Sequence, residues 1–218
     1  MVDYSLIQPH VDAGYAKAAT RLGPPYQQFR ASGPNTPLAV VLATLNVWAT
    51  TDAGLKGATP MQFGKPQWYA ALERAGLAVG DYLLGPQGTF FVSSLDYPGP
   101  VGLIYCNRTI NAARALDELP DGIYEPGGGN SIATAEPFMT GWPASVLQIG
   151  SGSKMASTGM NLPTDAKLPG VAILLPITAP QLLFNDFVTD DLGQRYAIAS
   201  AECSTLGWRL TGMMQPPG

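Results

Sequence analysis

The stretch GDYLLGPQGTFFVSSL at residues 80–95 is echoed by NDFVTDDLGQRYAIAS at residues 185–200. An aspartate, an aromatic residue and a glycine recur in the same order, with no gap, at a spacing of 105 residues. Asp81 and Asp186 mark the start of the two copies. The chain has no obvious catalytic motif, but one pattern of residues occurs in it twice.

The match extends on both sides of these stretches. The same spacing joins three further pairs: Leu77 with Leu182, Gly102 with Gly207, and WYAAL (68–72) with ILLPI (173–177). Residues 66–106 are thus expected to correspond to residues 171–211. Because the order of residue types is kept throughout, we predict that the chain contains one β unit twice.

Each copy has the pattern of an antiparallel β-meander. DYLL and DFVT begin a strand with alternating faces. GPQG and DDLG supply the turn, in which Gly88 and Gly193 accept the positive φ of a tight hairpin. TFFVSSL and QRYAIAS return antiparallel, and VGLIYCNRTI (101–110) and LGWRLTGM (206–213) form the third strand. Asp81 and Asp186 are expected to accept hydrogen bonds from backbone amides at the strand start, which is a structural role. Two closures satisfy the pattern: one barrel made by both meanders, or two small barrels packed together.

The composition favours contacts with neighbouring subunits. The 218 residues are 46% hydrophobic but only 13% charged, about half of the roughly 25% usual for a globular domain. Few charges remain to keep apolar patches and strand edges apart. Self-association is one interpretation, and a neutral monomer with loops rich in glycine and proline is the other.

The charge balance argues against direct binding of nucleic acid. The formal net charge is −4, and the chain has only 12 lysines and arginines. A protein that grips phosphates needs a basic footprint. A neutral or acidic wall can still surround DNA without holding it. The N-terminal residues show no signal peptide, and no apolar run has the length of a membrane span, so synthesis in a cytoplasm is expected.

The remaining N-terminal segments are assigned as follows. A helix is predicted at residues 5–22, with Ser5 or Asp3 as its N-cap. Its apolar face would consist of Ile7, Val11, Tyr15, Ala18 and Leu22. Gly23-Pro24-Pro25 ends this helix, and residues 24–37 are interpreted as an extended arm. Residues 1–37 thus form the first of three predicted units.

The second unit covers residues 38–141 and the third residues 142–218. One or two strands are expected at 38–50, and one each at 142–150 and 171–177. Residues 66–76 fit a short helix or a strand, and their match to 171–177 favours a strand. Residues 107–141 and 151–170 are interpreted as long loops, and loops of such length are typically used for contacts with partners.

The side chains of common catalytic and metal sites are scarce. His10 is the only histidine, which leaves a Ser-His-Asp or Cys-His arrangement and a His/Cys metal site without support. Cys106 and Cys203 are expected to be free, buried thiols. PGGGN (126–130) lacks the lysine of a phosphate-binding loop and is interpreted as a flexible turn. No catalytic, cofactor-binding or metal-binding residue is assigned, and the chain is not expected to be an enzyme.

Neither calcium binding by the aspartates nor carbohydrate binding by the tryptophans is favoured by where these residues lie. Asp186, Asp190 and Asp191 supply oxygen ligands of the kind that calcium prefers, but their places at a strand start and in a turn favour local hydrogen bonds. A sugar-binding platform would bring tryptophans together, whereas spread-out tryptophans are more typical of core or interface anchors. The four tryptophans are spread through the chain, at Trp48, Trp68, Trp142 and Trp208.

Residues 78–106 and 142–211 resemble the β-barrel proteins that join head and tail in tailed bacteriophages. A strand of those proteins carries aspartate, an aromatic residue or valine, then aspartate, glycine and tyrosine at fixed intervals. The matching residues here are Asp186, Phe187, Val188, Asp191, Gly193, Tyr196 and Ile198. WPASVLQ (142–148) also resembles virion proteins from phages of proteobacteria. The helix at 5–22 and the segment 107–141 lie outside the resemblance.

The residue patterns predict a mostly β protein of duplicated antiparallel meander or barrel units with one N-terminal helix and long loops. The resemblance implies a virion protein, assembled in the host cytoplasm, that forms a homo-oligomeric ring below the portal. Its partners would be the portal and other tail proteins, and DNA would pass through its lumen without specific binding. No cofactor is implied. Other tail components (nozzle or tube), a capsid decoration and a receptor- or glycan-binding virion module are the alternatives.

Overall fold

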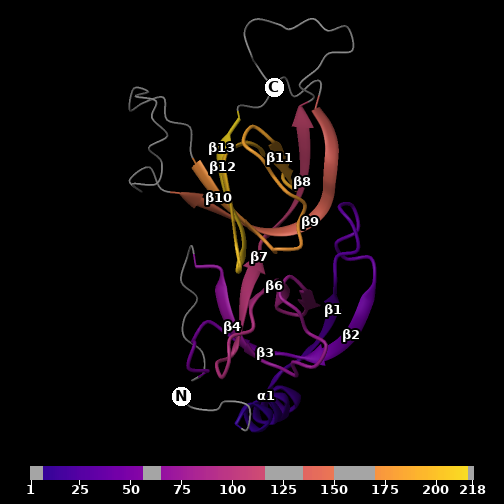
Figure 1. Cartoon of the computed structure of the whole chain (residues 1–218), viewed down its shortest axis with the longest axis vertical. Coiled ribbons are helices and arrows are strands. Elements are labelled where there is room, and N and C mark those ends of the chain that lie inside the picture. The colour runs from indigo at the N-terminus through magenta and orange to yellow at the C-terminus, as the bar shows by residue number, and fades with distance from the viewer. Residues whose placement is uncertain (1–6, 56–64, 116–134, 150–169, 216–218) are drawn as a thin grey trace, which may run out of the picture.

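The computed structural model describes residues 7–55, 65–115, 135–149 and 170–215. In this part of the chain one helix precedes the strands of two sheets (Figure 1). The elements are α1 (Gln8–Leu22), β1 (Pro25–Phe29), β2 (Val41–Asn46), β3 (Trp48–Thr50), β4 (Gln67–Ala71), β5 (Tyr82–Gly85), β6 (Gly88–Ser94), β7 (Val101–Cys106), β8 (Arg108–Ala115), β9 (Ala135–Ile149), β10 (Gly170–Leu175), β11 (Phe187–Asp190), β12 (Arg195–Ser204) and β13 (Gly207–Met214). The mostly β fold class with a single helix is confirmed.

The first seven strands form one sheet, which we call the curled sheet. Its order is β2-β1-β5-β6-β7-β4-β3. The two edge strands, β2 and β3, are consecutive in the chain and separated only by Val47, whose amide donates to the carbonyl of Pro24. The sheet must therefore bend round until its two edges meet at Val47.

The last six strands form a closed barrel in the order β10-β13-β12-β11-β8-β9. Strand β9 pairs with β8 through its first part and with β10 through its last part. The pair β2 and β3 has the same relation to β1 and β4. Strand by strand, the closed barrel therefore repeats the curled sheet, and each meander pairs with its own flanking strands.

The strand registers confirm this equivalence at the start of each copy. Phe29 faces Tyr82 between β1 and β5, and Ala113 faces Phe187 between β8 and β11. Both β6 and β12 carry an irregularity at the matching point, between Val92 and Ser94 and between Ile198 and Ser200. The duplication predicted from the sequence is a duplication of the fold.

The prediction that the two copies keep an uninterrupted spacing of 105 residues is wrong after the β5–β6 turn and its counterpart, the β11–β12 turn. Tyr82 faces Phe91, whereas Phe187 faces Ala197, because the second turn is one residue longer. Tyr196 thus occupies the place of Phe90, and Ala197 that of Phe91.

The third strands drift further apart. Gly102 lies opposite Ser94, and the residue opposite the equivalent Ser200 is Thr211, not Gly207. The extra residues lengthen the β12–β13 hairpin. The match of WYAAL is also shifted by two residues. Trp68 on β4 pairs with Leu103 on β7, and the residue that pairs with the equivalent position of β13 is Val171 on β10, not Ile173. Both segments lie mostly in strands, as predicted, but β4 ends at Ala71 and β10 at Leu175.

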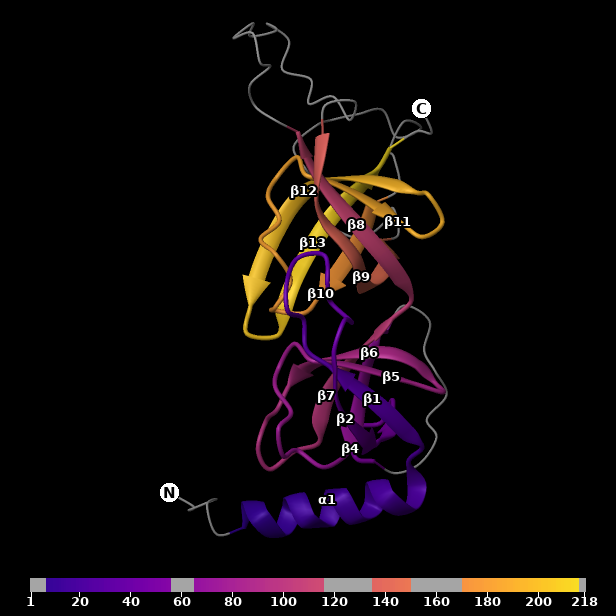
Figure 2. The same cartoon turned by 90° about the vertical axis from the view of Figure 1, so that its right-hand side faces the viewer.

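The two sheets follow each other along the long axis of the molecule, with α1 beyond the curled sheet (Figure 2). In this view β1 and β8 slant the same way. The boundary between the two sheets is Asn107, between β7 and β8. The boundary predicted from the sequence lies between residues 141 and 142.

Strand β8 and the start of β9 fall in the segment 107–141, for which a loop is predicted. That prediction is wrong for residues 108–115 and 135–141.

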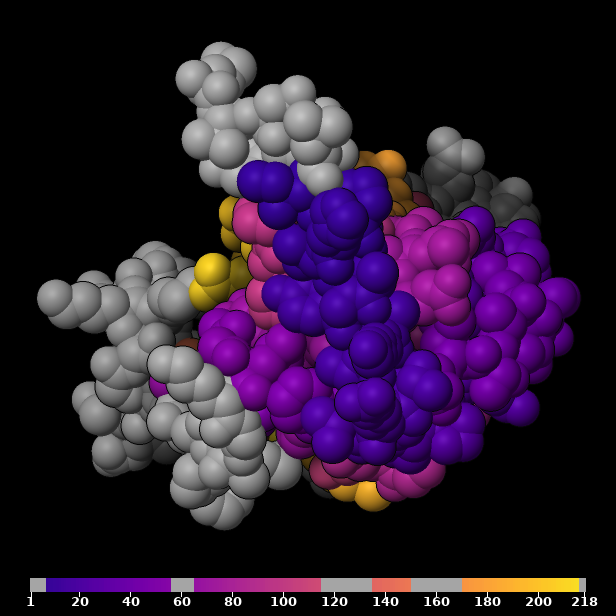
Figure 3. All heavy atoms as spheres, turned by 90° about the horizontal axis from the view of Figure 1, so that it is seen from below, coloured from indigo at the N-terminus to yellow at the C-terminus, as the bar shows by residue number. Residues whose placement is uncertain are grey.

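The N-terminal helix lies across the end of the curled sheet (Figure 3). Gly23 ends it, as predicted, and the backbone there approaches Val47 so closely that a Cβ atom would not fit. The predicted cap is wrong, because Ile7 is the N-cap and makes no side-chain bond. The predicted apolar face is right in its middle, where Val11, Tyr15 and Ala18 are half-buried, and wrong at its ends, where Ile7 and Leu22 are exposed. The one fully buried residue of the helix is Ala19.

The predicted arm at 24–37 contains a strand. Its first residues form β1, and its remainder belongs to the β1–β2 loop, which touches the closed barrel. Trp142 donates through its indole nitrogen to the carbonyl of Pro34, at 2.6 Å. PGGGN (126–130) and most of 151–170 lie outside the described residues.

Side chains fill both units. Inside the curled sheet the core contains Tyr26, Leu83, Phe90, Val92 and Leu103, all at most 1% exposed. The closed barrel is filled by Ile110, Ile173, Val188, Ile198 and Leu210. A six-stranded barrel packed in this way has no channel of its own.

Candidate functional site: the repeated aspartate brace and the ends of the two units

Asp81 lies just before β5 and is held by a two-point contact with Arg30, which follows β1. The Nε of Arg30 donates to Oδ1 at 2.7 Å and one terminal nitrogen donates to Oδ2 at 2.8 Å. The backbone amide of Ala78 and the side-chain amide of Gln28 also donate to Oδ2. The carboxylate is 1% exposed and the arginine 44% exposed. This arrangement, which we call the aspartate brace, ties the loop before β5 to the neighbouring strand.

Asp186 forms the same brace in the closed barrel. Arg114 of β8 donates through Nε at 2.7 Å and through a terminal nitrogen at 2.8 Å, and the amide of Leu183 donates to Oδ2 at 2.7 Å. Each arginine also donates to a loop carbonyl, that of Gly76 or Gln181. Hydrogen bonding to the aspartate raises the pKa of both guanidinium groups. The expected role of Asp81 and Asp186 is confirmed, but each also carries an arginine partner.

Sequence reasoning missed Arg30 and Arg114 because they do not share the spacing of the aspartates. They are 84 residues apart, while the aspartates are 105 apart. The segment between β1 and β5 includes β2, β3 and β4, whereas β8 and β11 are separated by β9 and β10. A search that allowed the spacing to change between strands would have paired QFR (28–30) with AAR (112–114).

Asp190 organises the β11–β12 turn and does not join Asp186. Its Oδ1 accepts from the amides of Leu192 and Gln194, and its Oδ2 accepts from the hydroxyl of Tyr196 at 2.9 Å. Burial, followed by the hydrogen bond to Asp190, raises the pKa of Tyr196 to about 12. Asp191 is half exposed and lies 3.9 Å from Arg108. Asp190 also lies 3.8 Å from the Nε of Arg108. The bonds of Asp190 within the turn agree with the turn interpretation.

The contact between the two units centres on Tyr82. Its hydroxyl donates to the carbonyl of Pro143 at 2.8 Å, and its ring packs edge-on against Trp142. Burial raises the pKa of Tyr82 well above its usual value. Phe91, beside Tyr82, belongs to the same buried cluster as the closed-barrel core. The outer face of β5 and β6 is therefore an interface within the chain.

The other singled-out residues lie apart from one another. His10 is exposed on α1. Both cysteines are free, as expected, but only Cys106 is buried, and Cys203 is exposed near the end of β12. Trp142 lies in the closed-barrel core, while Trp68 packs on Phe90 and Tyr105 in the curled sheet.

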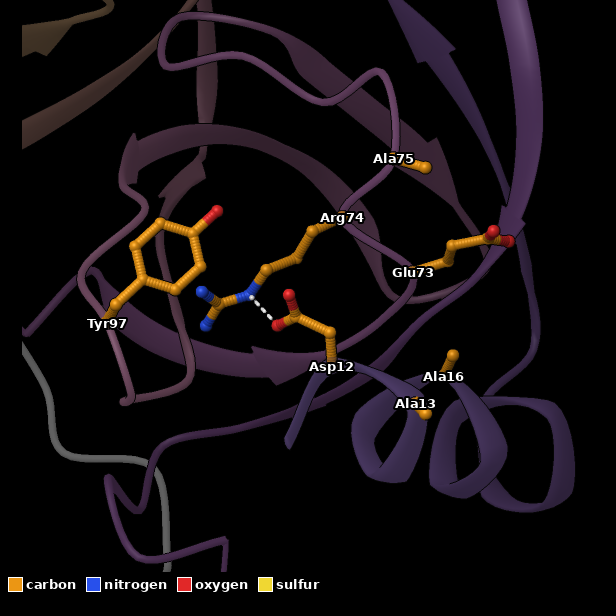
Figure 4. A pocket seen from close by; sticks show the side chains of 7 residues that line it. All are labelled: Asp12, Ala13, Ala16, Glu73, Arg74, Ala75 and Tyr97. Atoms are coloured by element: carbon orange, nitrogen blue, oxygen red, sulfur yellow. Dashed lines mark ion pairs between the residues drawn. The ribbon is translucent and has the colours of Figure 1, made fainter. Parts of the chain in front are cut away.

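A cavity of about 360 Å³ lies between α1 and the loop after β4 (Figure 4). Arg74 points into it, and its guanidinium lies 4.6 Å from the centre of the Tyr97 ring and pairs with Asp12 of α1. One terminal nitrogen of Arg74 also donates to the carbonyl of Gly99. The buried arginine thus holds the helix, the loop after β4 and the β6–β7 loop together, and its partners identify the cavity as a structural junction.

Among the described residues no group of three or more histidine, cysteine or acidic side chains is placed to hold a metal ion. The described part of the chain also contains no helix with the length and apolar character needed to cross a membrane. The sequence matches no protein-family model and no curated protein, and its fold matches no solved structure.

Proposed function

We propose that this chain is a structural protein of a tailed-phage virion, and that it forms a ring at the head–tail junction below the portal. The observation that carries the proposal is the hairpin of β11 and β12. The residues through which the sequence resembles head–tail joining proteins, from Asp186 to Ile198, form this hairpin and its brace within a closed barrel. Their hydrogen bonds lie within the barrel, which agrees with a structural role.

The charge content supports the same role. With 13% charged residues and a net charge of −4, the surface has little to oppose contact with other copies and little to grip phosphates. Because the cores of both units are filled, DNA would run through a lumen between several copies rather than through a single chain. Heterologous contacts around a closed rotation generate such a ring.

Electron microscopy of the purified protein, together with mass spectrometry of purified virions, tests the proposal. We expect closed rings and the presence of the chain in particles at many copies. A persistent monomer that is absent from particles would contradict it. Localisation away from the neck would favour the other assignments, namely a nozzle or tube component, a capsid decoration or a glycan-binding module.

A further inference from the structure

The two edge strands of the curled sheet differ in how well they are covered. Strand β3 has only three residues, of which Ala49 and Thr50 are buried. Strand β2 has six residues, pairs only with β1 in the described part of the chain, and lies on the outer side of the sheet (Figure 1). An uncovered strand edge presents backbone amides and carbonyls that can pair with another strand. The β2 edge is therefore a candidate interaction surface.

The register shows which backbone groups of β2 point away from β1. The amide of Val47 donates to the carbonyl of Pro24, which makes this a bonded position that continues the β1–β2 ladder. In an antiparallel pair, bonded positions alternate with positions whose backbone groups point outwards. Leu45 thus turns its backbone groups towards β1, while Thr44 and Asn46 present theirs at the free edge.

The side chains at the start of this edge are apolar and exposed. Val40, Val41 and Leu42 are 54%, 47% and 48% exposed. Three exposed apolar residues in succession are not expected on a surface that meets only water. Edge strands are usually protected by charged residues or proline, and residues 38–50 contain neither. The register shifts once, at Leu42, and the rest of the edge is regular and accessible.

The β2 edge also continues the interface between the two units. Val41 pairs with Phe29, Phe29 pairs with Tyr82, and Tyr82 pairs with Phe91. Directly paired side chains lie on the same face of a sheet, so these four residues form one row. The last three belong to the buried cluster of the closed-barrel core, whereas Val41 at the end of the row is exposed. A strand added beside β2 would extend this row.

We propose that β2 pairs antiparallel with the β2 edge of a second copy of this chain, across a twofold axis. In such a contact each surface meets itself, so a charged strand would oppose its own charges. Residues 38–50 carry no charge, and a strand edge is complementary to itself in the antiparallel direction. Because Thr44 and Asn46 lie on one face of β2, pairing them across the axis joins the outer faces of both sheets.

This contact goes beyond the proposed function. A twofold contact is complete with two copies, whereas the proposed ring requires heterologous contacts. One pair of six-residue strands is smaller than a stable interface of roughly 1,200 Å². We therefore expect a reversible dimer whose population rises with protein concentration.

The test uses Thr44→Pro, with Thr44→Val as its matched control. Thr44 is exposed and its amide points away from β1, so proline removes a donor from the free edge and none from the β1–β2 pair. Valine keeps the donor and favours a strand. Analytical ultracentrifugation over a concentration series measures dimerisation, and thermal unfolding checks the fold. Because each dimer contains the position twice, we expect Thr44→Pro to weaken dimerisation at least about tenfold, with Thr44→Val equal to the wild type.

A charge pair tests the second copy without altering the backbone. Thr44→Lys and Thr44→Glu each place like charges near the axis, so each variant alone should dimerise less than the wild type. An equimolar mixture of the two should restore dimers, because opposite charges then meet. A mixture that dimerises no better than either variant alone contradicts the pairing of β2 with itself.

The remaining outcomes separate this inference from the proposed function. Dimerisation that is unchanged in a folded Thr44→Pro variant overturns the β2 edge as the site. A wild-type protein that stays monomeric up to its solubility limit overturns the second copy as its occupant. Virions that lack the chain contradict the proposed function alone, since dimerisation is measured on the purified protein.

Discussion

The curled sheet and the closed barrel are built to one plan, yet their braced aspartates differ in support. Asp81 keeps two donors besides Arg30, namely the Ala78 amide and the Gln28 side chain. Asp186 keeps only the Leu183 amide besides Arg114 within the described structure, because Ala112 stands where Gln28 would be. The comparison teaches that the repeated feature is the carboxylate with its arginine, while the surroundings have diverged.

The largest expected effect follows from this difference. Arg114→Ala leaves a buried carboxylate with a single donor and should lower the free energy of unfolding by about 3–5 kcal/mol. Arg30→Ala leaves two donors in place, so its cost should be about half as large. Chemical denaturation of both variants measures the two values. Equal losses would show that Gln28 does not share in the brace.

The hairpin glycines give the next contrast. Gly88 has a φ of 116°, and a Cβ atom there would lie 2.7 Å from the Tyr105 ring, whereas Gly193 has a φ of 76° and open space around it. Gly88→Ala should cost about 2–4 kcal/mol through backbone strain and crowding. Gly193→Ala should cost about 1–2 kcal/mol through strain alone. Thermal and urea unfolding decide the order, and a reversed order would contradict the assigned crowding.

The interface between the two units offers a smaller test. Tyr82→Phe removes the donor to the Pro143 carbonyl and leaves that acceptor unpaired, which should cost about 1–2 kcal/mol. At the equivalent position, Phe187→Leu should change stability by less than about 0.5 kcal/mol when the chain is monomeric. Denaturation at low protein concentration measures both. A Tyr82→Phe variant as stable as the wild type would show that the ring alone holds the interface.

The smallest effect concerns pH. The pKa of Tyr196 is raised to about 12 in the folded protein, while the unfolded residue ionises near pH 10. The contribution of the protonated hydroxyl is therefore complete below about pH 10 and is lost as the pH rises through about 12. Tyr196→Phe should cost about 1 kcal/mol at neutral pH, and its difference from the wild type should vanish across this window. A difference independent of pH would contradict the role of the hydroxyl.

The fold could be predicted from the sequence where the pattern is local. Gly88 and Gly193 mark turns, and alternation of apolar residues marks β5, β6 and β11. The duplicated meander could therefore be predicted from the sequence. The strands β8 and the start of β9 were missed, because RTINAARA (108–115) has few β-branched or aromatic residues and is a strand through its pairing with β9 and β11.

The site was predictable only in part. Asp81 and Asp186 could be found because each stands at the same distance in sequence from the glycine of the following turn, Gly88 or Gly193. Arg30 and Arg114 were not found, because the elements inserted before each aspartate differ in length. The exposure of Cys203 also escaped prediction, since it depends on the extension of the β12–β13 hairpin.

By itself, the sequence determined that the chain is mostly β, that one unit occurs twice, and where each hairpin turns. These features depend on residue type and on spacing within one meander, where backbone conformation and alternation suffice. Only the tertiary structure decided that each meander pairs with its own flanking strands, that arginines from distant strands hold the aspartates, and that Tyr82 is buried while Phe187 is partly exposed. Such features depend on which surfaces meet after the chain has curled, and contacts between distant strands leave no fixed spacing in the sequence.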